Sequence, residues 1–253
     1  VTARAGKLLR DGLIGEVRVA RAWTAETRKL VLPKPDGRPP EGVDYDRWLG
    51  PAPAVKFNPL RFHQTWRMFR DYGNGEIGDD GIHDLDLAMW MLGRKPNSVF
   101  AKNIRIHDFP YPDAGWAMFD FSQSGNTTET LVVIETHWGL PSSTETVIDA
   151  RMEIIGTEGK ITIDCSQTGL HIKSDQSRHV DTCYWPKVGS EFEPNFPALP
   201  GYGILMRELE YFANCVRRGR NPTVISVQQA CDALEMILIA QESADSQQPI
   251  QIS

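Results

Sequence analysis

The stretch Ile148-Asp-Ala-Arg-Met-Glu-Ile-Ile-Gly-Thr-Glu-Gly-Lys-Ile-Thr-Ile-Asp164 predicts two antiparallel strands, Thr146–Ile155 and Lys160–Asp164, joined by a hairpin turn at Gly156-Thr-Glu-Gly159. In the first strand apolar residues alternate with charged ones, which is the period of a strand with two unlike faces. The two alternating sets are Ile148, Ala150, Met152 and Ile154, and Asp149, Arg151 and Glu153. We therefore expect one face of this sheet to be packed and the other to meet solvent or a partner.

Working outward from the hairpin, four more segments are predicted to be strands: Glu16–Trp23, Ser98–Ile106, Trp116–Phe121 and Thr128–His137. From Asp79 to Leu92 the period becomes helical, with one apolar stripe formed by Ile82, Leu85, Met89 and Leu92. A run of strands accompanied by helices indicates the α+β class. We expect an open, predominantly antiparallel sheet with helices packed on one face.

Two helices are predicted near the C-terminus. The first ends at Gly219 and carries an apolar stripe formed by Leu205, Leu209, Phe212 and Val216. The second begins after the N-cap Ser226, with Gln229 completing a capping box. It is expected to bury an apolar set formed by Val227, Ala230, Leu234 and Ile237.

Residues 33–59 are rich in proline and glycine and carry no sustained period, so we predict a long loop that serves a site or an interface. Residues 3–10 have the pattern of the tail of a helix, which suggests a chain cut within that helix. No glycine-rich strand-to-helix fingerprint of a dinucleotide site is present. Gly73, Gly75 and Gly78 do not provide one, because no hydrophobic strand precedes them.

The composition of the 253 residues excludes several classes of function. A formal net charge of -6 argues against a nucleic-acid partner. The four cysteines have no paired spacing that would indicate a zinc site or a redox dithiol, so we interpret them as reduced thiols. No apolar run approaches the roughly 20 residues that span a bilayer, and no signal-peptide region opens the chain, so we expect a cytoplasmic location without a membrane partner.

The stretch from Tyr72 to Trp90 crowds acids and one histidine at the start of a predicted helix. Asp79 and His83 are four residues apart, so on one helix they share a face and can touch, and Asp86 extends the same stripe. A helix N-terminus favours neutral imidazole whereas a neighbouring carboxylate favours imidazolium. These opposed influences suit a general base that works near neutral pH.

Two other interpretations of this stretch stay open. Asp79 can simply cap the helix, with His83 as an ordinary surface or core residue. A metal site formed by Asp79, His83 and Asp86 is also conceivable, but no second histidine or cysteine completes a recognisable ligand set, and we expect no metal.

The segment Asp79-x-Gly81-x-His83-x-x-Asp86, followed by Trp90-Met-Leu-Gly93, resembles the active-site helix of the Gfo/Idh/MocA oxidoreductases. Four further segments resemble the C-terminal domain of that family in its usual order: Gly12-Leu-Ile-Gly-Glu-Val17, Trp48-Leu-Gly-Pro-Ala-Pro53, Ile155-Gly-Thr-Glu-Gly-Lys-Ile161, and Glu208-x-x-x-Phe212 through Arg220-Asn-Pro222. The resemblance covers nearly the whole chain. It implies one substrate-binding C-terminal domain over residues 1–253, with the long loop at 33–59 and no Rossmann domain.

The resemblance also implies roles for two residues. His83 would accept the proton of a substrate hydroxyl as hydride leaves the same carbon for nicotinamide, and Asp79 would position and charge-balance the imidazole. The catalytic lysine of the family lies in a Glu-Lys-Pro motif of the Rossmann domain and has no counterpart here. We therefore expect NAD or NADP in the full-length enzyme, none bound to this chain alone, and a homo-oligomer formed through the sheet face.

The segment Phe57-Asn-Pro-Leu-Arg-Phe-His-Gln-Thr-Trp-Arg67 resembles the loop that approaches the substrate in related proteins. Arg61, His63, Trp66 and Arg67 would offer hydrogen-bond donors and a flat apolar surface to a sugar or polyol. With Asp86 they are the predicted substrate-binding residues. The alternative is that Trp66 belongs to the core and that the arginines are surface residues.

The leading hypothesis is thus the substrate-binding portion of an NAD(P)-dependent oxidoreductase that acts on a sugar or polyol hydroxyl and is inactive without its Rossmann domain. Two alternatives stay open: a free-standing carbohydrate-binding or oligomerisation domain, and a cofactor-free lyase or hydrolase that uses Asp79 and His83.

Overall fold

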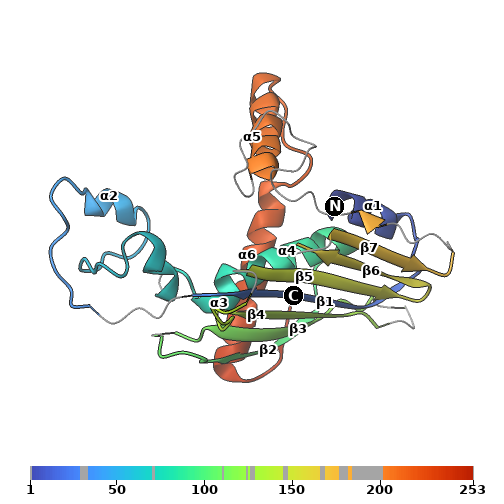
Figure 1. Cartoon of the computed structure of the whole chain (residues 1–253), viewed down its shortest axis with the longest axis horizontal. Helices are drawn as coiled ribbons and strands as arrows, with labels where there is room; N and C mark the ends of the chain where they lie inside the picture. Colours follow the sequence, from blue (N-terminus) through green and yellow to red (C-terminus); the bar gives the residue numbers. More distant parts are fainter. Residues whose placement is uncertain are drawn as a thin grey trace.

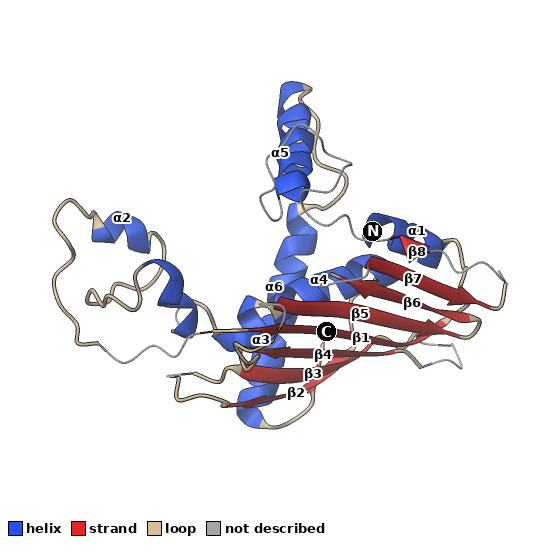
Figure 2. Cartoon of the chain, viewed as in Figure 1, coloured by secondary structure: helices blue, strands red, loops and turns tan. Residues whose placement is uncertain are grey.

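The structure of the chain is a computed structural model that describes residues 2–28, 34–69, 72–109, 111–123, 125, 129–144, 148–165, 169–176, 182–183 and 202–252. Within these residues nine strands form one sheet, and helices cover one of its faces (Figures 1 and 2). The strands are β1 (Val17–Glu26), β2 (Ser98–Ile104), β3 (Ala114–Asp120), β4 (Leu131–His137), β5 (Ile148–Gly156), β6 (Gly159–Asp164), β7 (Gly169–Ser174), β8 (Thr182–Cys183) and β9 (Ile250–Gln251). The helices are α1 (Thr2–Arg10), α2 (Tyr45–Leu49), the 3-10 helix η1 (His63–Met68), α3 (Gly75–Asp79), α4 (Gly81–Leu92), α5 (Tyr202–Arg217) and α6 (Val227–Ser246).

The strand order is β8-β7-β6-β5-β1-β4-β3-β2-β9, which places β1 in the middle of the sheet. The pair β1–β4 is parallel, and the other described pairs are antiparallel. The predicted hairpin is present as β5 and β6, with Ile154 opposite Ile161. The predicted α+β class, with an open and mostly antiparallel sheet, is confirmed.

The core lies between the sheet and the helices α1, α3, α4 and α6. On β5 the alternation predicts the buried side correctly for Met152 and Ile154, whereas Ile148 is exposed. Ile148 opens the strand, opposite Glu26 at the end of β1. The predicted start of this strand at Thr146 lies outside the described residues.

The buried side of α6 differs from the predicted one. Val227 is 82% exposed and Leu234 is 50% exposed, and Ala230 is exposed as well, so of the predicted set only Ile237 is buried. The predicted set lies mostly in the first turns of α6, which project away from the sheet together with α5 (Figure 1). The buried side chains of α6 are Ala233, Met236, Ile237, Ala240 and Ser243.

The capping box at the start of α6 is confirmed: the Ser226 side chain accepts a hydrogen bond from the Gln229 backbone at 3.1 Å, and the Gln229 side chain accepts one from the Ser226 backbone at 2.8 Å. On α5 the apolar residues Leu209, Phe212 and Val216 are exposed. This stripe therefore has the predicted helical period without forming part of the described core.

The predicted loop at 33–59 is partly helical, because α2 lies within it. Together with η1 it forms a lobe beside the sheet (Figure 1). The lobe has a small aromatic core of its own, formed by Tyr45, Trp48, Phe57, Phe62 and Tyr72. Ring packing of this kind explains how a segment without hydrophobic periodicity holds a defined shape.

Three of the four cysteines, Cys165, Cys215 and Cys231, are free thiols. The side chain of Cys183 lies outside the described residues. Among the described helices none is both long and apolar enough to cross a membrane.

Candidate active site

The predicted helix Asp79–Leu92 begins earlier than expected and is divided in two. The short helix α3 ends at Asp79 and α4 starts at Gly81, with Asp80 between them. The chain enters α3 through Asn74 and Gly75, which both have positive φ values, 55° and 74°. Gly75 suits this left-handed conformation because it lacks a Cβ atom. α3 packs against β3, β4 and η1, so its acidic residues lie where the lobe meets the sheet.

Gly73 brings η1 close to this junction. A Cβ atom at position 73 would lie only 2.2 Å from the backbone oxygen of Arg67 and 2.5 Å from its Cα atom. Only glycine allows this approach. The close contact places Arg67 beside the end of α3.

Asp79 is held by two arginines. The Nε atom of Arg67 donates a hydrogen bond to Oδ1 at 3.1 Å and lies 3.0 Å from Oδ2, while a terminal nitrogen of Arg28 lies 3.7 Å from Oδ2. Burial and the charge of Asp80 raise the pKa of Asp79, against the opposing effect of Arg67 and Arg28. The side chain predicted to be the orienting carboxylate is thus fixed in place.

The predicted contact between His83 and Asp79 is not found: the described residues show no hydrogen bond or ion pair between the two side chains. The i,i+4 relationship requires one continuous helix, and the break at Asp80 puts Asp79 and His83 on separate helices. His83 is exposed on α4, and its charge acts on Asp86, whose pKa is raised by burial and lowered by His83.

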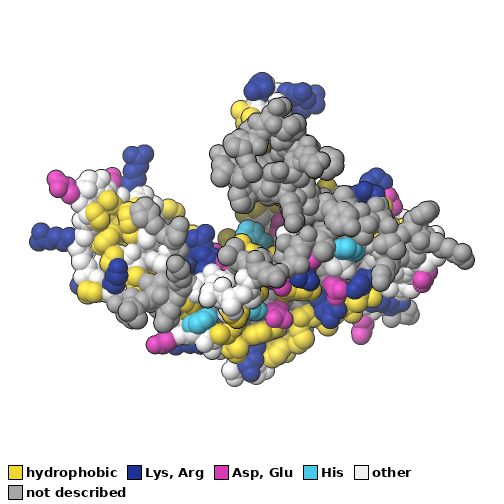
Figure 3. Space-filling view, viewed as in Figure 1, with side chains coloured by type: hydrophobic (Ala, Val, Ile, Leu, Met, Phe, Trp, Pro, Cys, Tyr) yellow, Lys and Arg dark blue, Asp and Glu magenta, His cyan; other side chains and the backbone are white. Residues whose placement is uncertain are grey.

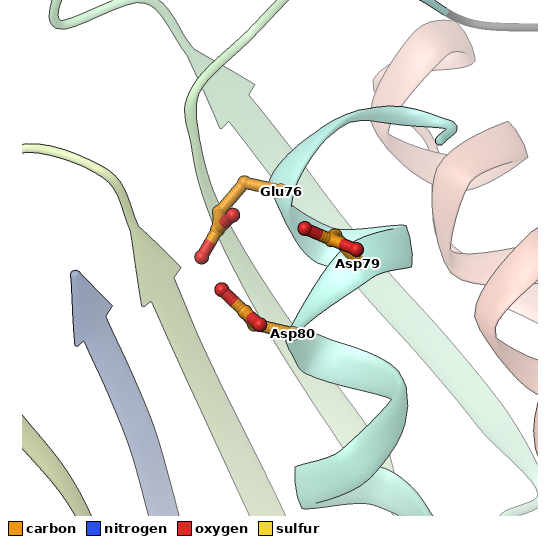
Figure 4. Close-up of side chains that lie close together, drawn as sticks. All are labelled: Glu76, Asp79 and Asp80. Carbon is orange, nitrogen blue, oxygen red and sulfur yellow. The ribbon is translucent and has the colours of Figure 1, made fainter. Parts of the chain in front are cut away.

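Glu76 and Asp80, which were not predicted to belong to the site, lie next to Asp79. Figure 4 shows the carboxyl groups of Glu76 and Asp80 pointing toward each other with Asp79 beside them. One oxygen from each of the three residues lies within 4.8 Å of the others. Burial, followed by the charge of Asp80, raises the pKa of Glu76 to about 11. The i, i+3, i+4 spacing of these acids would have been the signal in the sequence.

Two residues at the end of β1 complete the charged environment. Arg28 lies 2.6 Å from Glu26 and stacks over the buried ring of Trp138, with 5.5 Å from the guanidinium carbon to the ring centroid. Burial and the charge of Asp80 raise the pKa of Glu26. Sequence reasoning missed both residues because it ended the strand at Trp23.

Asp84 is a second buried acid of α4. The Thr24 hydroxyl donates to its carboxylate at 3.2 Å, and burial raises the pKa of Asp84 to about 7 despite this bond. The side chain faces the sheet near the end of β1, so it adds to the negative charge of the site.

The predicted substrate-binding residues are only partly brought together. Arg67 reaches Asp79 and stacks over Trp66, with 4.5 Å from its guanidinium carbon to the ring centroid. Arg61 instead lies over the ring of Phe69 at 4.6 Å and donates to the Lys56 backbone oxygen at 2.9 Å, inside the lobe. The side chain of His63 lies outside the described residues.

Comparison with known proteins agrees with this architecture. Residues 22–117 match a family model described as "Oxidoreductase family, C-terminal alpha/beta domain", which belongs to the Gfo/Idh/MocA oxidoreductases. The matched segment runs from within β1 through the lobe, α3 and α4 to β3, and so contains the acids, the arginines and the histidine of the candidate site. The predicted resemblance to the C-terminal domain of that family is confirmed over residues 22–117.

Individual relatives are longer than this chain. The scyllo-inositol 2-dehydrogenase (NAD(+)) of Bacillus subtilis (strain 168) is 29% identical over 192 residues, which cover 73% of this chain and 49% of the relative. The aldose-aldose oxidoreductase of Caulobacter crescentus, solved with glycerol, matches with a TM-score of 0.65 at 17% identity, over 99% of this chain and 60% of that one. A levoglucosan dehydrogenase in complex with NADH matches with a TM-score of 0.67 at 17% identity, over 98% of this chain and 62% of that one. The chain thus spans about half the length of the curated relative.

Proposed function

We propose that this chain is the substrate-binding domain of an NAD(P)-dependent oxidoreductase that oxidises a CH–OH group of a sugar or polyol. The observation that carries the proposal is an exposed histidine, His83, on the helix that follows an arginine-held carboxylate, Asp79. The named relatives support the substrate class and the cofactor, since they include an NAD(+)-dependent inositol dehydrogenase and a dehydrogenase bound to NADH. In this proposal residues 1–253 form one domain, with the lobe as part of its substrate side, and are inactive without a dinucleotide-binding domain.

The geometry supports the following roles. His83 accepts the proton of the substrate hydroxyl, because it is exposed and imidazole is the side chain most often used as a general base. Asp86 stabilises the imidazolium that forms, through the interaction described above. Bound nicotinamide supplies the hydride acceptor, so the alcohol loses one hydride and one proton and becomes a carbonyl.

Asp79 and Arg67 orient the substrate in this scheme. Two guanidinium groups hold the carboxylate of Asp79 in one position, and an acceptor fixed in this way can receive a hydrogen bond from a second substrate hydroxyl without reorganisation. Arg67 offers further donors from its planar group. Arg61 stays a predicted substrate-binding residue, although its guanidinium is already engaged within the lobe.

The test is carried out on the full-length gene product, by following NADH formation at 340 nm with scyllo-inositol, levoglucosan and related polyols. His83→Ala is expected to lower the rate about 10²–10⁴-fold, the usual contribution of a general base. His171→Ala, on β7, serves as the matched control and should leave the rate unchanged. NADH formation by residues 1–253 alone, or an unimpaired His83→Ala variant, would overturn the proposal.

A second assay distinguishes the cofactor-free lyase or hydrolase from the oxidoreductase. Residues 1–253 are incubated with keto-sugars in the absence of NAD, and released products are separated by chromatography. Product that appears with the unaltered chain and disappears with His83→Ala would establish a lyase or hydrolase instead.

We also propose that the uncovered sheet face mediates homo-oligomer formation. Four apolar side chains are exposed on this face, on neighbouring strands β2, β3 and β4: Phe100, Ile104, Met118 and Leu131. Figure 3 shows hydrophobic side chains gathered over this part of the sheet. A contiguous exposed apolar patch of this kind commonly marks an interface.

Met118→Glu places a charge in this patch and is expected to reduce the mass of the oligomer measured by light scattering. An unchanged mass would count against this interface.

A further inference from the structure

The three acids Glu76, Asp79 and Asp80 have an unusual environment for carboxyl groups. Glu76 is 1% exposed, and its carboxyl oxygens receive no hydrogen bond from an N–H donor among the described residues and lie against the carboxyl group of Asp80. The Oδ2 atoms of Asp79 and Asp80 are also shielded from solvent without a hydrogen bond. Each of the three residues thus points at least one unbonded oxygen into a space shared with the others, as Figure 4 shows.

Burying carboxyl oxygens without partners is costly, so such groups are normally neutralised by a proton, a cation or hydrogen bonds. Arg67 and Arg28 pair with Asp79, whereas both carboxyl oxygens of Glu76 and Oδ2 of Asp80 receive no hydrogen bond from an N–H donor among the described residues. Neutralisation within the shared space is therefore left to a proton or a cation.

We propose that Glu76, Asp79 and Asp80 bind a divalent cation that prefers oxygen ligands, such as Mg²⁺ or Mn²⁺. Carboxylate oxygens are the preferred protein ligands of these hard cations, and no softer ligand is present in the three-residue cluster. In an octahedral site with ligands at about 2.0–2.1 Å, the ligand oxygens are separated by roughly 3–4 Å. The three oxygens lie within 4.8 Å of one another, so small side-chain shifts would bring them onto one cation.

The contact of Asp79 with Arg67 is compatible with this site. Arg67 donates its hydrogen bond to Oδ1 of Asp79 and also lies 3.0 Å from Oδ2, an oxygen that receives no hydrogen bond of good geometry. A carboxylate held by an arginine in this way is oriented for a cation, as outer hydrogen bonds orient metal ligands generally. With three protein ligands, the cation retains open positions for water or a substrate hydroxyl.

The site is tested with Mn²⁺ alone, titrated into residues 1–253, with free Mn²⁺ measured by electron paramagnetic resonance. One Mn²⁺ per chain is expected to bind, and Mg²⁺ should displace it. Glu76→Gln and Asp80→Asn should each weaken binding at least about tenfold, because a charged ligand is lost. The exposed acid Glu242 on α6 provides the matched control, and Glu242→Gln should bind as the unaltered chain does.

Several results would overturn the site. If Mn²⁺ does not bind stoichiometrically at millimolar concentration, the site does not exist. If the folded Glu76→Gln and Asp80→Asn variants bind Mn²⁺ as tightly as the unaltered chain, any bound cation is adventitious. If Glu76→Gln raises the unfolding temperature while Mn²⁺ has no effect on the unaltered chain, a proton shared by the acids neutralises them instead. Circular dichroism verifies folding, and Asp80→Asn, at the less buried position, decides the outcome if Glu76→Gln does not fold. None of these measurements depends on dehydrogenase activity.

Discussion

Replacing Gly73 with alanine is expected to destabilise the junction between the lobe and the sheet. The added Cβ atom would lie 2.2, 2.5 and 2.6 Å from three backbone atoms of Arg67, which are its O, Cα and C atoms. Normal contacts of a carbon atom begin near 3.4 Å, so the backbone of η1 must move by about 1 Å. Overpacking of a buried site lowers the free energy of unfolding by about 1–3 kcal/mol. We expect the upper half of that range, because the atoms in contact belong to the backbone and cannot rotate aside as a side chain could.

This cost has a measurable size. For a domain of this length each kcal/mol lowers the melting temperature by roughly 2–4 °C, so a loss of about 2–3 kcal/mol predicts a decrease of roughly 4–12 °C. The assay is thermal unfolding followed by circular dichroism. The matched control is Gly37→Ala in the same lobe, where a Cβ atom would meet nothing within 4 Å. If Gly73→Ala and Gly37→Ala unfold within about 1 °C of each other, the reasoning from close approach is refuted.

Three other perturbations test the fold. Phe119→Ala removes a fully buried ring from the core and should cost about 3–5 kcal/mol in urea unfolding, and a loss below about 1 kcal/mol would contradict its place there. Ser226→Ala removes the capping box of α6 and should cost about 1 kcal/mol, measured in the same way, whereas Ser226→Gly should recover most of that loss. Hydrogen bonds and charges from Lys160 and Arg21 lower the pKa of Glu153, so this residue stabilises the folded state above its unfolded pKa of about 4.3, and the contribution is lost as pH falls through the lower folded value. The free energy of unfolding should therefore change less between pH 6 and pH 3 in Glu153→Gln than in the unaltered chain. An equal change in the two proteins would show that the ion pair does not cause the pH dependence.

Much of the fold follows from periodicity in the sequence. The β5–β6 hairpin and the start of α6 were predictable, because their signals are local: alternation, a glycine-containing turn and a capping box. The strands β7, β8 and β9 were missed, and two of them are only two residues long, too short for any period to be visible. The buried side of α6 was misassigned because a helical stripe identifies an apolar face without indicating where the neighbouring layer ends.

The candidate site was predictable in its residue types and not in its contacts. The motif containing Asp79 and His83 marks the correct segment, but the break at Asp80 redirects each side chain to a different partner. Arg28 reaches Asp79 only because β1 continues to Glu26, beyond the point where Arg21 interrupts the alternation. Such contacts depend on where distant segments meet in space, which spacing along the chain does not encode.

The central position of β1 has a consequence for how the chain folds. β1 precedes its two neighbours in the sheet, β4 and β5, by more than a hundred residues of sequence. Val19 pairs with Leu131, and Ala20 pairs with Ile154. During synthesis both edges of this strand lack their partners until β4 and β5 have emerged from the ribosome. Contacts between segments so far apart close long loops and slow the formation of the native sheet. Between the synthesis of β1 and that of β4 and β5, the nascent chain therefore exposes unpaired strand edges, which favour aggregation.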